Sequence, residues 1–325
     1  MNRIQIGGRQ IVIKPQSLIG ILTGIQLDES GTASWPPRVQ GMGVVITNEC
    51  QLTCAHCYNQ SSPFRHLSLD KEKLIRACEC LKKEFPGFKA ISLSGGEPFL
   101  YPDVEEVAEA ISALDIHVSC VTGGGGVSPD EISRLAEHGV SEYAISRDTY
   151  HSRFVSEESF LRLVDAASDA VSNVTIKFCV HSEQEYEGMR SKWDGVMRKS
   201  IVFEFYGLTP FGRTRRNQGE ITDPFKRYNE DSGCFQEFGV IALNSDGKIY
   251  PCCSTGGFTP GLELCSIDDL IEKGELSHFY LQRDDLRDIA FNGWDKVPGQ
   301  TKCEQCNYKF RLPQLKCRSM MLEEG

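Results

Sequence analysis

Six short apolar runs alternate with amphipathic helical patterns between Gly43 and Gly207. The helical patterns repeat apolar residues every three or four positions, which is the spacing of one helix face. Strands that alternate with helices form parallel, right-handed units, and six of them favour an open or partial barrel over a flat sheet. The sequence therefore predicts an α/β fold, a partial (β/α)6 barrel with strands at residues 43–47, 90–93, 116–121, 143–146, 174–180 and 201–206.

Two of the predicted helices have recognisable starts. Ser68 stands before the first helical pattern and is the expected N-cap. The run Ser128-Pro129-Asp130-Glu131 combines a capping box with proline at the first helical position. We therefore expect a helix from about residue 129.

The regular alternation stops after the sixth strand. Residues 208–233 are an arginine-rich stretch with proline and glycine, which predicts a linker. Residues 238–250 then read as a β-hairpin that turns at Asn244-Ser245-Asp246-Gly247. We expect an N-terminal extension over 1–42 with a hairpin around Ile11, the barrel over 43–207, and a small cysteine-rich β-hairpin/α domain over 234–325.

Composition limits the classes of partner. The formal net charge of −10 gives no support to a nucleic-acid partner, because phosphate binding needs concentrated Lys and Arg. The sequence has no apolar run of bilayer length, and its start lacks the layout of a signal peptide. The protein is therefore expected to be cytoplasmic, with neither a membrane nor a nucleic acid as partner.

The fourteen cysteines are the unusual part of the composition. In a reducing compartment, cysteines at short spacings more often bind metal or do redox chemistry than form disulfides. Four of them fall within predicted helices and strands and are expected to fill the core: Cys78, Cys80, Cys120 and Cys179. The others gather near Cys50 and in the final third of the chain.

The first group has the spacing C-x3-C-x2-C, formed by Cys50, Cys54 and Cys57 directly after the first strand. Three thiolates on one loop can ligate three irons of a [4Fe–4S] cluster, whereas a fully protein-ligated cluster needs four. The open iron can then chelate the amino and carboxylate groups of S-adenosylmethionine (SAM). A zinc site with a distant fourth ligand is the alternative reading of the same spacing.

The neighbouring residues resemble the radical SAM superfamily. Its pattern is C-x3-C-x-aromatic-C, in which His56 takes the aromatic place, and Ser94-Gly95-Gly96-Glu97-Pro98 is similar to its GGEP motif. The resemblance implies that His56 packs near the adenine, that the glycines let the backbone approach the ligand, and that Glu97 holds the SAM ammonium group. It also implies reductive cleavage of SAM to a 5′-deoxyadenosyl radical, which abstracts a hydrogen from an unactivated carbon.

The resemblance extends to other strand ends. Ser146, at the end of the fourth strand, takes the place of a SAM-contacting serine. The four glycines of residues 123–126 depart from the usual Thr-Asn-Gly; they are read as a flexible turn, with a cradle for SAM as the alternative.

The C-terminal cysteines resemble the twitch form of the SPASM auxiliary-cluster domain. The resemblance rests on Cys234, on Cys252 at the end of a G-x4-C hairpin, and on the C-x2-C pair Cys303 and Cys306. It implies a second, auxiliary [4Fe–4S] cluster on these four thiols. A zinc ribbon is the alternative, and Cys265 and Cys317 leave a further cluster open.

Cys253 follows the expected ligand Cys252 and is not itself assigned to a cluster. Its thiol is a candidate hydrogen-atom donor to a substrate radical, as the spare cysteine is in radical SAM epimerases. A buried thiol without a role is the alternative.

Substrate contacts are expected at strand ends and on one strand face. Because alternate strand residues point to the same side, the candidates on the last two strands are Lys177, Glu204 and Tyr206. Arg147, Asp148 and His151 follow the fourth strand at the expected mouth of the barrel. Solvent-facing or surface ion-pair positions are the alternatives.

The expected substrate is a peptide that is epimerised, oxidised or crosslinked, with a small molecule such as an aminocyclitol or sugar as the second choice. A non-catalytic iron–sulfur or zinc scaffold is the rival class. A flavodoxin- or ferredoxin-type protein is the expected electron donor. The run Arg213, Arg215 and Arg216 is read as solvated linker, with donor docking as the alternative.

Overall fold

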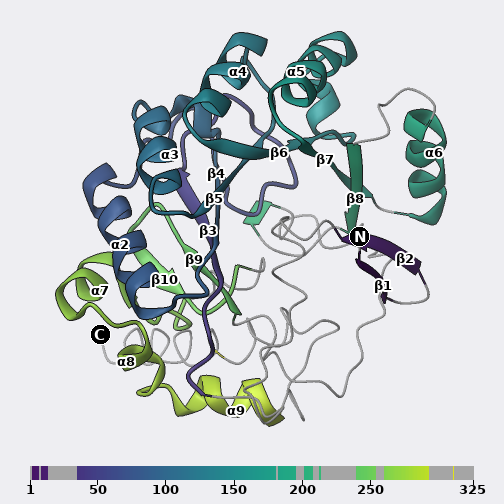
Figure 1. The fold of residues 1–325 in the computed structure, drawn as a ribbon. Helices are drawn as coiled ribbons and strands as arrows, with labels where there is room; N and C mark the ends of the chain where they lie inside the picture. The colour runs from purple at the N-terminus through teal and green to yellow at the C-terminus, as the bar shows by residue number, and fades with distance from the viewer. Residues whose placement is uncertain are drawn as a thin grey trace, which may run out of the picture.

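The computed structural model describes residues 2–6, 9–13, 35–180, 182–194, 201–207, 212–213, 239–253, 260–292 and 310. Their main feature is a nine-stranded sheet in the order β11-β10-β9-β3-β4-β5-β6-β7-β8 (Figure 1). Its parallel strands are β3 (Gly41–Thr47), β4 (Ala90–Gly95), β5 (His117–Thr122), β6 (Val140–Ser146), β7 (Asn173–Val180), β8 (Ile201–Gly207) and β9 (Val240–Leu243). The predicted α/β fold is confirmed, and the sheet is open because β8 and β11 are its edges.

Helices connect the successive parallel strands. They are α2 (Lys71–Glu84), α3 (Val104–Ser112), α4 (Pro129–Glu137), α5 (Glu157–Ala170) and α6 (Glu183–Asp194), with short 3-10 turns η1 (Pro98–Leu100) and η2 (His151–Arg153). Figure 1 shows α2 to α5 along one side of the sheet, where each contacts the next. This is the arrangement that right-handed βαβ units impose.

Of the two predicted helix N-caps, one is confirmed and one is wrong. The capping box of α4 is confirmed: the Ser128 side chain accepts from the backbone N–H of Glu131, and the Glu131 side chain accepts from that of Ser128. The prediction that Ser68 caps α2 is wrong, because the N-cap is Asp70, whose side chain accepts from the backbone of Lys73 at 2.9 Å. The Ser68 hydroxyl is instead bonded to the Thr47 hydroxyl at 2.8 Å, at the end of β3.

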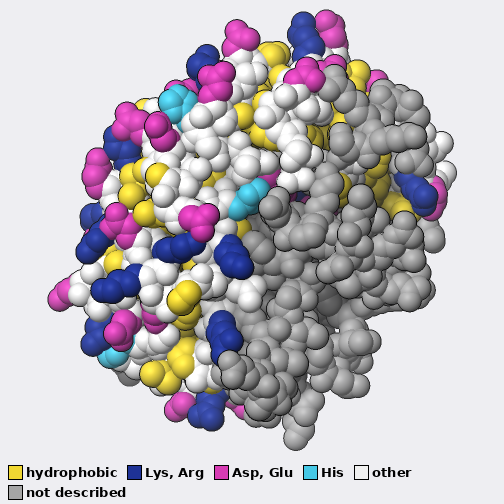
Figure 2. Space-filling model, in the orientation of Figure 1, with side chains coloured by type: hydrophobic (Ala, Val, Ile, Leu, Met, Phe, Trp, Pro, Cys, Tyr) yellow, Lys and Arg dark blue, Asp and Glu magenta, His cyan; other side chains and the backbone are white. Residues whose placement is uncertain are grey.

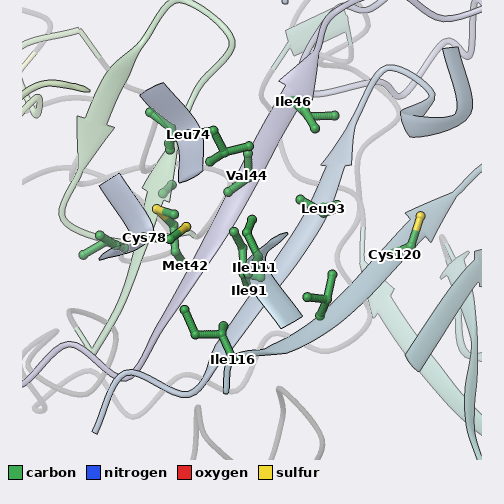
Figure 3. Close-up of a cluster of buried hydrophobic side chains, with 14 of the residues drawn as sticks. Met42, Val44, Ile46, Leu74, Cys78, Ile91, Leu93, Ile111, Ile116 and Cys120 are labelled. Atoms are coloured by element: carbon green, nitrogen blue, oxygen red, sulfur yellow. The ribbon is translucent and has the colours of Figure 1, made fainter. Parts of the chain in front are cut away.

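Apolar side chains fill the space between the sheet and the helices (Figure 3). Val44 of β3 and Leu93 of β4 are fully buried, as is Leu74 of α2 on the opposite side of this layer. Cys78 and Cys120 lie in the same core with no exposed surface, as the sequence predicted for them. Burial of these side chains removes apolar surface from water, which is the main force that holds helices on the sheet.

The C-terminal hairpin joins the same sheet as the barrel strands. β9 pairs with β10 (Lys248–Tyr250), as predicted, and β10 pairs with β11 (Cys265–Ser266). β9 also pairs in parallel with β3, in the register Gly41 to Val240 and Val44 to Leu243. The sequence placed this hairpin in a separate domain. In the structure all four residues of β9 are buried, which is the pattern of an interior strand.

Three short helices follow the hairpin: α7 (Ile267–Lys273), α8 (Ser277–Tyr280) and α9 (Asp284–Asn292). α7 packs against α2, where Lys73 forms an ion pair with Asp268 at 2.7 Å. The side chain of Glu84 accepts from the backbone of Leu276 and Ser277. The described part of the C-terminal region is therefore attached to the barrel.

The N-terminal segment forms the hairpin expected around Ile11. β1 (Asn2–Ile6) pairs antiparallel with β2 (Arg9–Ile13) in a two-stranded sheet of its own. No helix within the described residues is long and apolar enough to cross a membrane.

Charged side chains of both signs are interspersed over the described part of the face in Figure 2. Among the described residues, Lys71 forms ion pairs with Asp103 at 3.3 Å and Glu106 at 2.6 Å, and Arg134 with Glu105 at 3.3 Å. Such exposed pairs contribute little to stability, so the core and the strand pairing carry the fold.

If the hairpin is part of the barrel, Ile241→Ala on β9 should destabilise both the hairpin and the neighbouring barrel strand β3. Ile241 has no exposed surface, and truncation of such a side chain costs about 2–5 kcal/mol. We expect faster hydrogen exchange, measured by mass spectrometry, in residues 41–47 as well as in 239–253. Phe64→Ala is the control, since Phe64 is 88% exposed. Faster exchange confined to residues 239–253 would show that the hairpin is an independent unit.

Candidate active site

A cavity of about 400 Å³ opens at the carboxyl ends of the parallel strands. Parallel α/β folds place their ligand sites at this end. The residues proposed from the sequence that line it are Cys50, Cys54, His56, Cys57, Gly95, Gly96, Ser146, His151, Lys177, Glu204 and Cys253. Positions spread over 200 residues of sequence therefore meet in one site.

The cysteine loop, residues 48–62, leaves the end of β3 and returns beside it. Cys50 donates its backbone N–H to Ser62 at 3.3 Å and accepts at its sulfur from Leu52 at 3.4 Å. Cys50 and Cys54 are buried and Cys57 is half-buried, and the three pack in one cluster with Leu52. All cysteines in the described part of the chain are free thiols.

The chemistry of the three thiols fits an iron–sulfur cluster. Burial raises the pKa of the Cys50 and Cys54 thiols to about 12, so both keep their protons at neutral pH unless a cation replaces them. Thiolate is the form that binds metal, and soft sulfur ligands suit iron–sulfur clusters rather than hard cations. The radical SAM superfamily uses a [4Fe–4S] cluster with SAM, and this donor set fits that cluster.

The two glycines of the Gly-Gly-Glu-Pro turn let β4 approach the cysteine loop. A Cβ on Gly95 would lie 2.3 Å from the carbonyl oxygen of Thr47, and one on Gly96 would lie 1.8 Å from that of Glu49. The backbone N–H of Gly96 donates to Thr47 at 2.7 Å, and that of Glu97 donates to Glu49 at 2.8 Å. The resemblance implied that these glycines let the backbone approach the ligand. In the structure, the atoms that leave no room for a side chain at Gly95 and Gly96 belong to the backbone just before Cys50.

Glu97 is fully buried beneath the cavity and is not among its lining residues. Its carboxylate accepts from the Thr122 hydroxyl at 2.8 and 2.9 Å and from the backbone N–H of Gly123 at 3.2 Å. These bonds join the end of β4 to the end of β5 and hold the glycine turn that follows. The structure therefore gives Glu97 a scaffold role, and its contact with the SAM ammonium stays a prediction.

His56 and His151 enclose the buried carboxylate of Asp148. Asp148 Oδ1 contacts His151 Nδ1 at 2.9 Å, and Oδ2 lies 3.4 Å from His56 Nε2. Burial alone would raise the pKa of Asp148, but the hydrogen bond from His151 and the nearby His56 ring hold it well below its usual range. The His56 ring also stacks on Tyr150, with 4.3 Å between centroids. Asp148 thus fixes both rings at the cavity wall.

The last two parallel strands supply a charged pair. Lys177 and Glu204 are register partners on β7 and β8, and their side chains are 3.2 Å apart at the cavity. Cys179, expected as core filler, is buried and also lines the cavity. Tyr206 lies on β8, but its side chain is outside the described residues.

Cys253 lies on the cavity wall, whereas its neighbour Cys252 does not. The backbone N–H of Cys253 donates to Val240 at 3.0 Å, which attaches it to β9. A Cβ on Gly43 would lie 3.1 Å from the Cβ of Cys253, so the small residue on β3 makes room for this cysteine. Cys253 therefore shares one cavity with the three thiols of the cysteine loop.

Sequence reasoning missed a contact made by Gly212 and Arg213. The Arg213 guanidinium lines the cavity and donates to the carbonyl oxygens of Cys54, at 2.7 Å, and Ser61. The sequence placed Arg213 in a linker, and no spacing rule connects it with a loop more than 150 residues earlier.

The other residues predicted for the site are Arg147 and the four expected ligands of the auxiliary cluster. Arg147 is buried beside the cavity rather than on its lining: it donates to the carbonyl of Val155 at 2.7 Å and lies over the Phe160 ring. Of the four expected auxiliary ligands only Cys252 is described, and it is half-buried. The other three, Cys234, Cys303 and Cys306, lie outside the described residues.

Comparison with known proteins identifies the barrel. Residues 44–189 match the model of the Radical SAM superfamily. This part of the chain is a radical SAM domain. The match spans the cysteine loop, the Gly-Gly-Glu-Pro turn and the strands from β3 to β7.

Two sets of relatives share this domain. The Bacillus subtilis protein named "Putative peptide biosynthesis protein YydG" is 24% identical over 234 residues, 69% of this chain and 72% of that protein. A probable GTP 3′,8-cyclase of Methanothermobacter thermautotrophicus is 28% identical over 142 residues, 42% of this chain and 45% of that enzyme.

Solved structures share the fold. Streptococcus suis SuiB matches 74% of this chain and 65% of its own, at 17% identity and a TM-score of 0.56. The structure of anSMEcpe with bound AdoMet and the Cp18Cys peptide matches 87% and 99% at 12% identity, with a TM-score of 0.52. These likenesses concern the fold alone.

Replacement of Glu97 by glutamine should change how stability depends on pH. Burial raises the pKa of Glu97 from 4.5 to about 7, so the folded protein binds this proton more tightly than the unfolded chain. The stabilisation is complete below the unfolded pKa and is lost as the pH rises through the folded pKa.

Between about pH 5 and about pH 8 we therefore expect the Tm of wild type to fall relative to that of Glu97→Gln, by the equivalent of about 3 kcal/mol. Thermal unfolding followed by circular dichroism over this range measures it. Parallel curves for the two proteins would contradict a buried, titrating Glu97.

Proposed function

We propose that this radical SAM enzyme epimerises a residue of a peptide substrate, with Cys253 as the hydrogen-atom donor. The observation that carries the proposal is the position of Cys253 on the cavity that Cys50, Cys54 and Cys57 also line. A thiol there can reach a substrate radical formed in the same cavity. The similarity to a relative named for peptide biosynthesis supports a peptide as the substrate.

Different residues of the cavity would bind the cluster and SAM. Cys50, Cys54 and Cys57 would hold the cluster, and SAM would lie against Gly95, Gly96, His56 and Ser146. When bound, the cluster and SAM supply a 5′-deoxyadenosyl radical that abstracts a hydrogen atom from the substrate. The buried Asp148 holds the His56 ring in place, and the apolar side chain of Leu52 helps to exclude water.

Lys177 and Glu204 are the proposed substrate contacts on the far strands. Each side chain is about one-third exposed, at 30% and 32%, so the pair is partly open to the cavity. A fixed cation beside a fixed anion can receive the carbonyl oxygen and the N–H of a peptide backbone. His151, in η2 just after β6, also lines the cavity.

The proposed epimerisation uses two hydrogen transfers. One C–H bond of the substrate breaks and its hydrogen passes to the adenosyl group, which leaves a carbon radical. The S–H bond of Cys253 then breaks, and a C–H bond forms on the opposite face of that carbon. The Cys253 thiyl radical regains its hydrogen by taking one electron and one proton, with the electron from a flavodoxin- or ferredoxin-type donor.

An auxiliary cluster on Cys234, Cys252, Cys303 and Cys306 is a further proposal. It would accept an electron from a substrate radical and direct the reaction toward oxidation or crosslinking. Zinc on the same four thiols would be structural instead. An iron count near eight per chain, rather than near four, would support the auxiliary cluster over zinc.

Replacement of Cys253 by alanine should separate radical formation from product formation. The variant is expected to form 5′-deoxyadenosine but to lose net epimerisation, since the second hydrogen has no source. Wild type in deuterium oxide should place one deuterium on the inverted carbon, measured by mass spectrometry. Cys80→Ala is the matched control, because Cys80 is buried on α2 and is not on the cavity lining. Full deuterated product from Cys253→Ala would overturn the donor assignment.

The substrate class is tested by stimulation of SAM cleavage. A peptide encoded beside the gene should raise the rate of 5′-deoxyadenosine formation, and Lys177→Met should weaken this stimulation. Aminocyclitols, sugars and GTP are the comparison compounds, with GTP chosen because cyclases of GTP match the same domain. Stimulation by one of these compounds and not by the peptide would contradict a peptide substrate.

A further inference from the structure

Gly212 brings the chain after β8 directly against the cysteine loop. Its φ is +62°, and a Cβ there would lie 2.3 Å from the carbonyl oxygen of Cys57 and 2.4 Å from the Cα of Tyr58. Real side chains do not fit such distances, so this backbone approach requires glycine. The next residue, Arg213, donates its backbone N–H to the same carbonyl of Cys57 at 3.1 Å.

The Arg213 side chain continues this contact along the loop. Its guanidinium donates to the carbonyl of Cys54 at 2.7 Å and to that of Ser61. One residue therefore satisfies three carbonyl oxygens of the loop, two of them on expected cluster ligands. The planar fork of arginine can hold two acceptors at once in a way that the lysine ammonium does not.

The charge of Arg213 lies beside the same thiols. The guanidinium lines the cavity that Cys50, Cys54 and Cys57 also line, and it is held 2.7 Å from the carbonyl oxygen of Cys54. A positive charge near a cluster favours the reduced state, because reduction adds one negative charge.

We propose that Arg213 is a positioning residue for the radical SAM cluster: it holds the cysteine loop in its ligand-binding shape, and its charge raises the reduction potential of the bound cluster. The inference rests on the assignment of Cys50, Cys54 and Cys57 as cluster ligands. It gives the stretch read as a linker from the sequence a direct part in cluster chemistry.

The test compares Arg213→Gln, Arg213→Lys and Arg162→Gln with wild type, all reconstituted without oxygen and checked for folding by circular dichroism. Arg162 is the control for loss of a surface charge, since its side chain is 61% exposed on α5. The readouts are iron and sulfide per chain and the midpoint potential of the paramagnetic signal that responds to SAM. Neither readout depends on substrate turnover.

We expect Arg213→Gln to have a more negative midpoint potential. At a fixed applied potential, its ratio of reduced to oxidised cluster should fall about tenfold, which is the effect of 59 mV on a one-electron couple. Arg213→Lys should keep most of the potential but hold less iron, because one ammonium replaces the fork. Arg162→Gln should match wild type in both readouts.

Gly212→Ala tests the backbone approach separately. It should hold less iron than wild type, whereas Gly188→Ala should not, because a Cβ on Gly188 in α6 meets nothing within 4 Å. Folded Arg213→Gln that loses its iron while Arg162→Gln retains it would also support the proposal. Wild-type iron with an unchanged potential in Arg213→Gln would overturn it. Absence of a SAM-responsive cluster from wild type would instead contradict the ligand assignment itself.

Discussion

The close backbone contact between the end of β4 and the start of the cysteine loop is the constraint on which the site depends. Two hydrogen bonds, from Gly96 to Thr47 and from Glu97 to Glu49, make this contact, and only glycine at positions 95 and 96 leaves room for it. The Glu97 carboxylate then extends the connection to Thr122 and Gly123 on β5. These hydrogen bonds connect three neighbouring strands beneath the cavity, and the strands in turn fix the position of the cysteine loop.

The second constraint is the balance of buried charge. Cys50, Cys54, Glu97 and Asp148 are all buried acids or potential acids around one cavity. Burial raises the pKa of both thiols and of Glu97, so these groups favour their neutral forms, whereas two histidines keep Asp148 ionised. Iron is the cation that would convert the thiols to ligands. The guanidinium of Arg213 places a positive charge on the same cavity.

Much of this arrangement could be predicted from the sequence because its signals are local. The period of apolar residues located the strands and helices, and the two motifs at strand ends placed the cluster loop beside the Gly-Gly-Glu-Pro turn. Long-range pairing could not be read in the same way. Nothing local connects β9 to β3, Glu97 to Thr122, or Arg213 to Cys54. The choice of Asp70 over Ser68 as N-cap also depended on a distant partner, since Thr47 engages the Ser68 hydroxyl.

The chemistry proposed for this site requires that Cys50, Cys54 and Cys57 bind a cluster that cleaves SAM. The most direct measurement is anaerobic reconstitution with iron and sulfide, then addition of dithionite and SAM, with 5′-deoxyadenosine quantified for wild type and Cys54→Ala. We predict 5′-deoxyadenosine from wild type and loss of it in the variant, with three to four fewer irons per chain, as expected for one cubane cluster of about four irons. A fully reconstituted wild type that forms no 5′-deoxyadenosine, with candidate substrates present, would contradict SAM cleavage at this site and favour a metal scaffold.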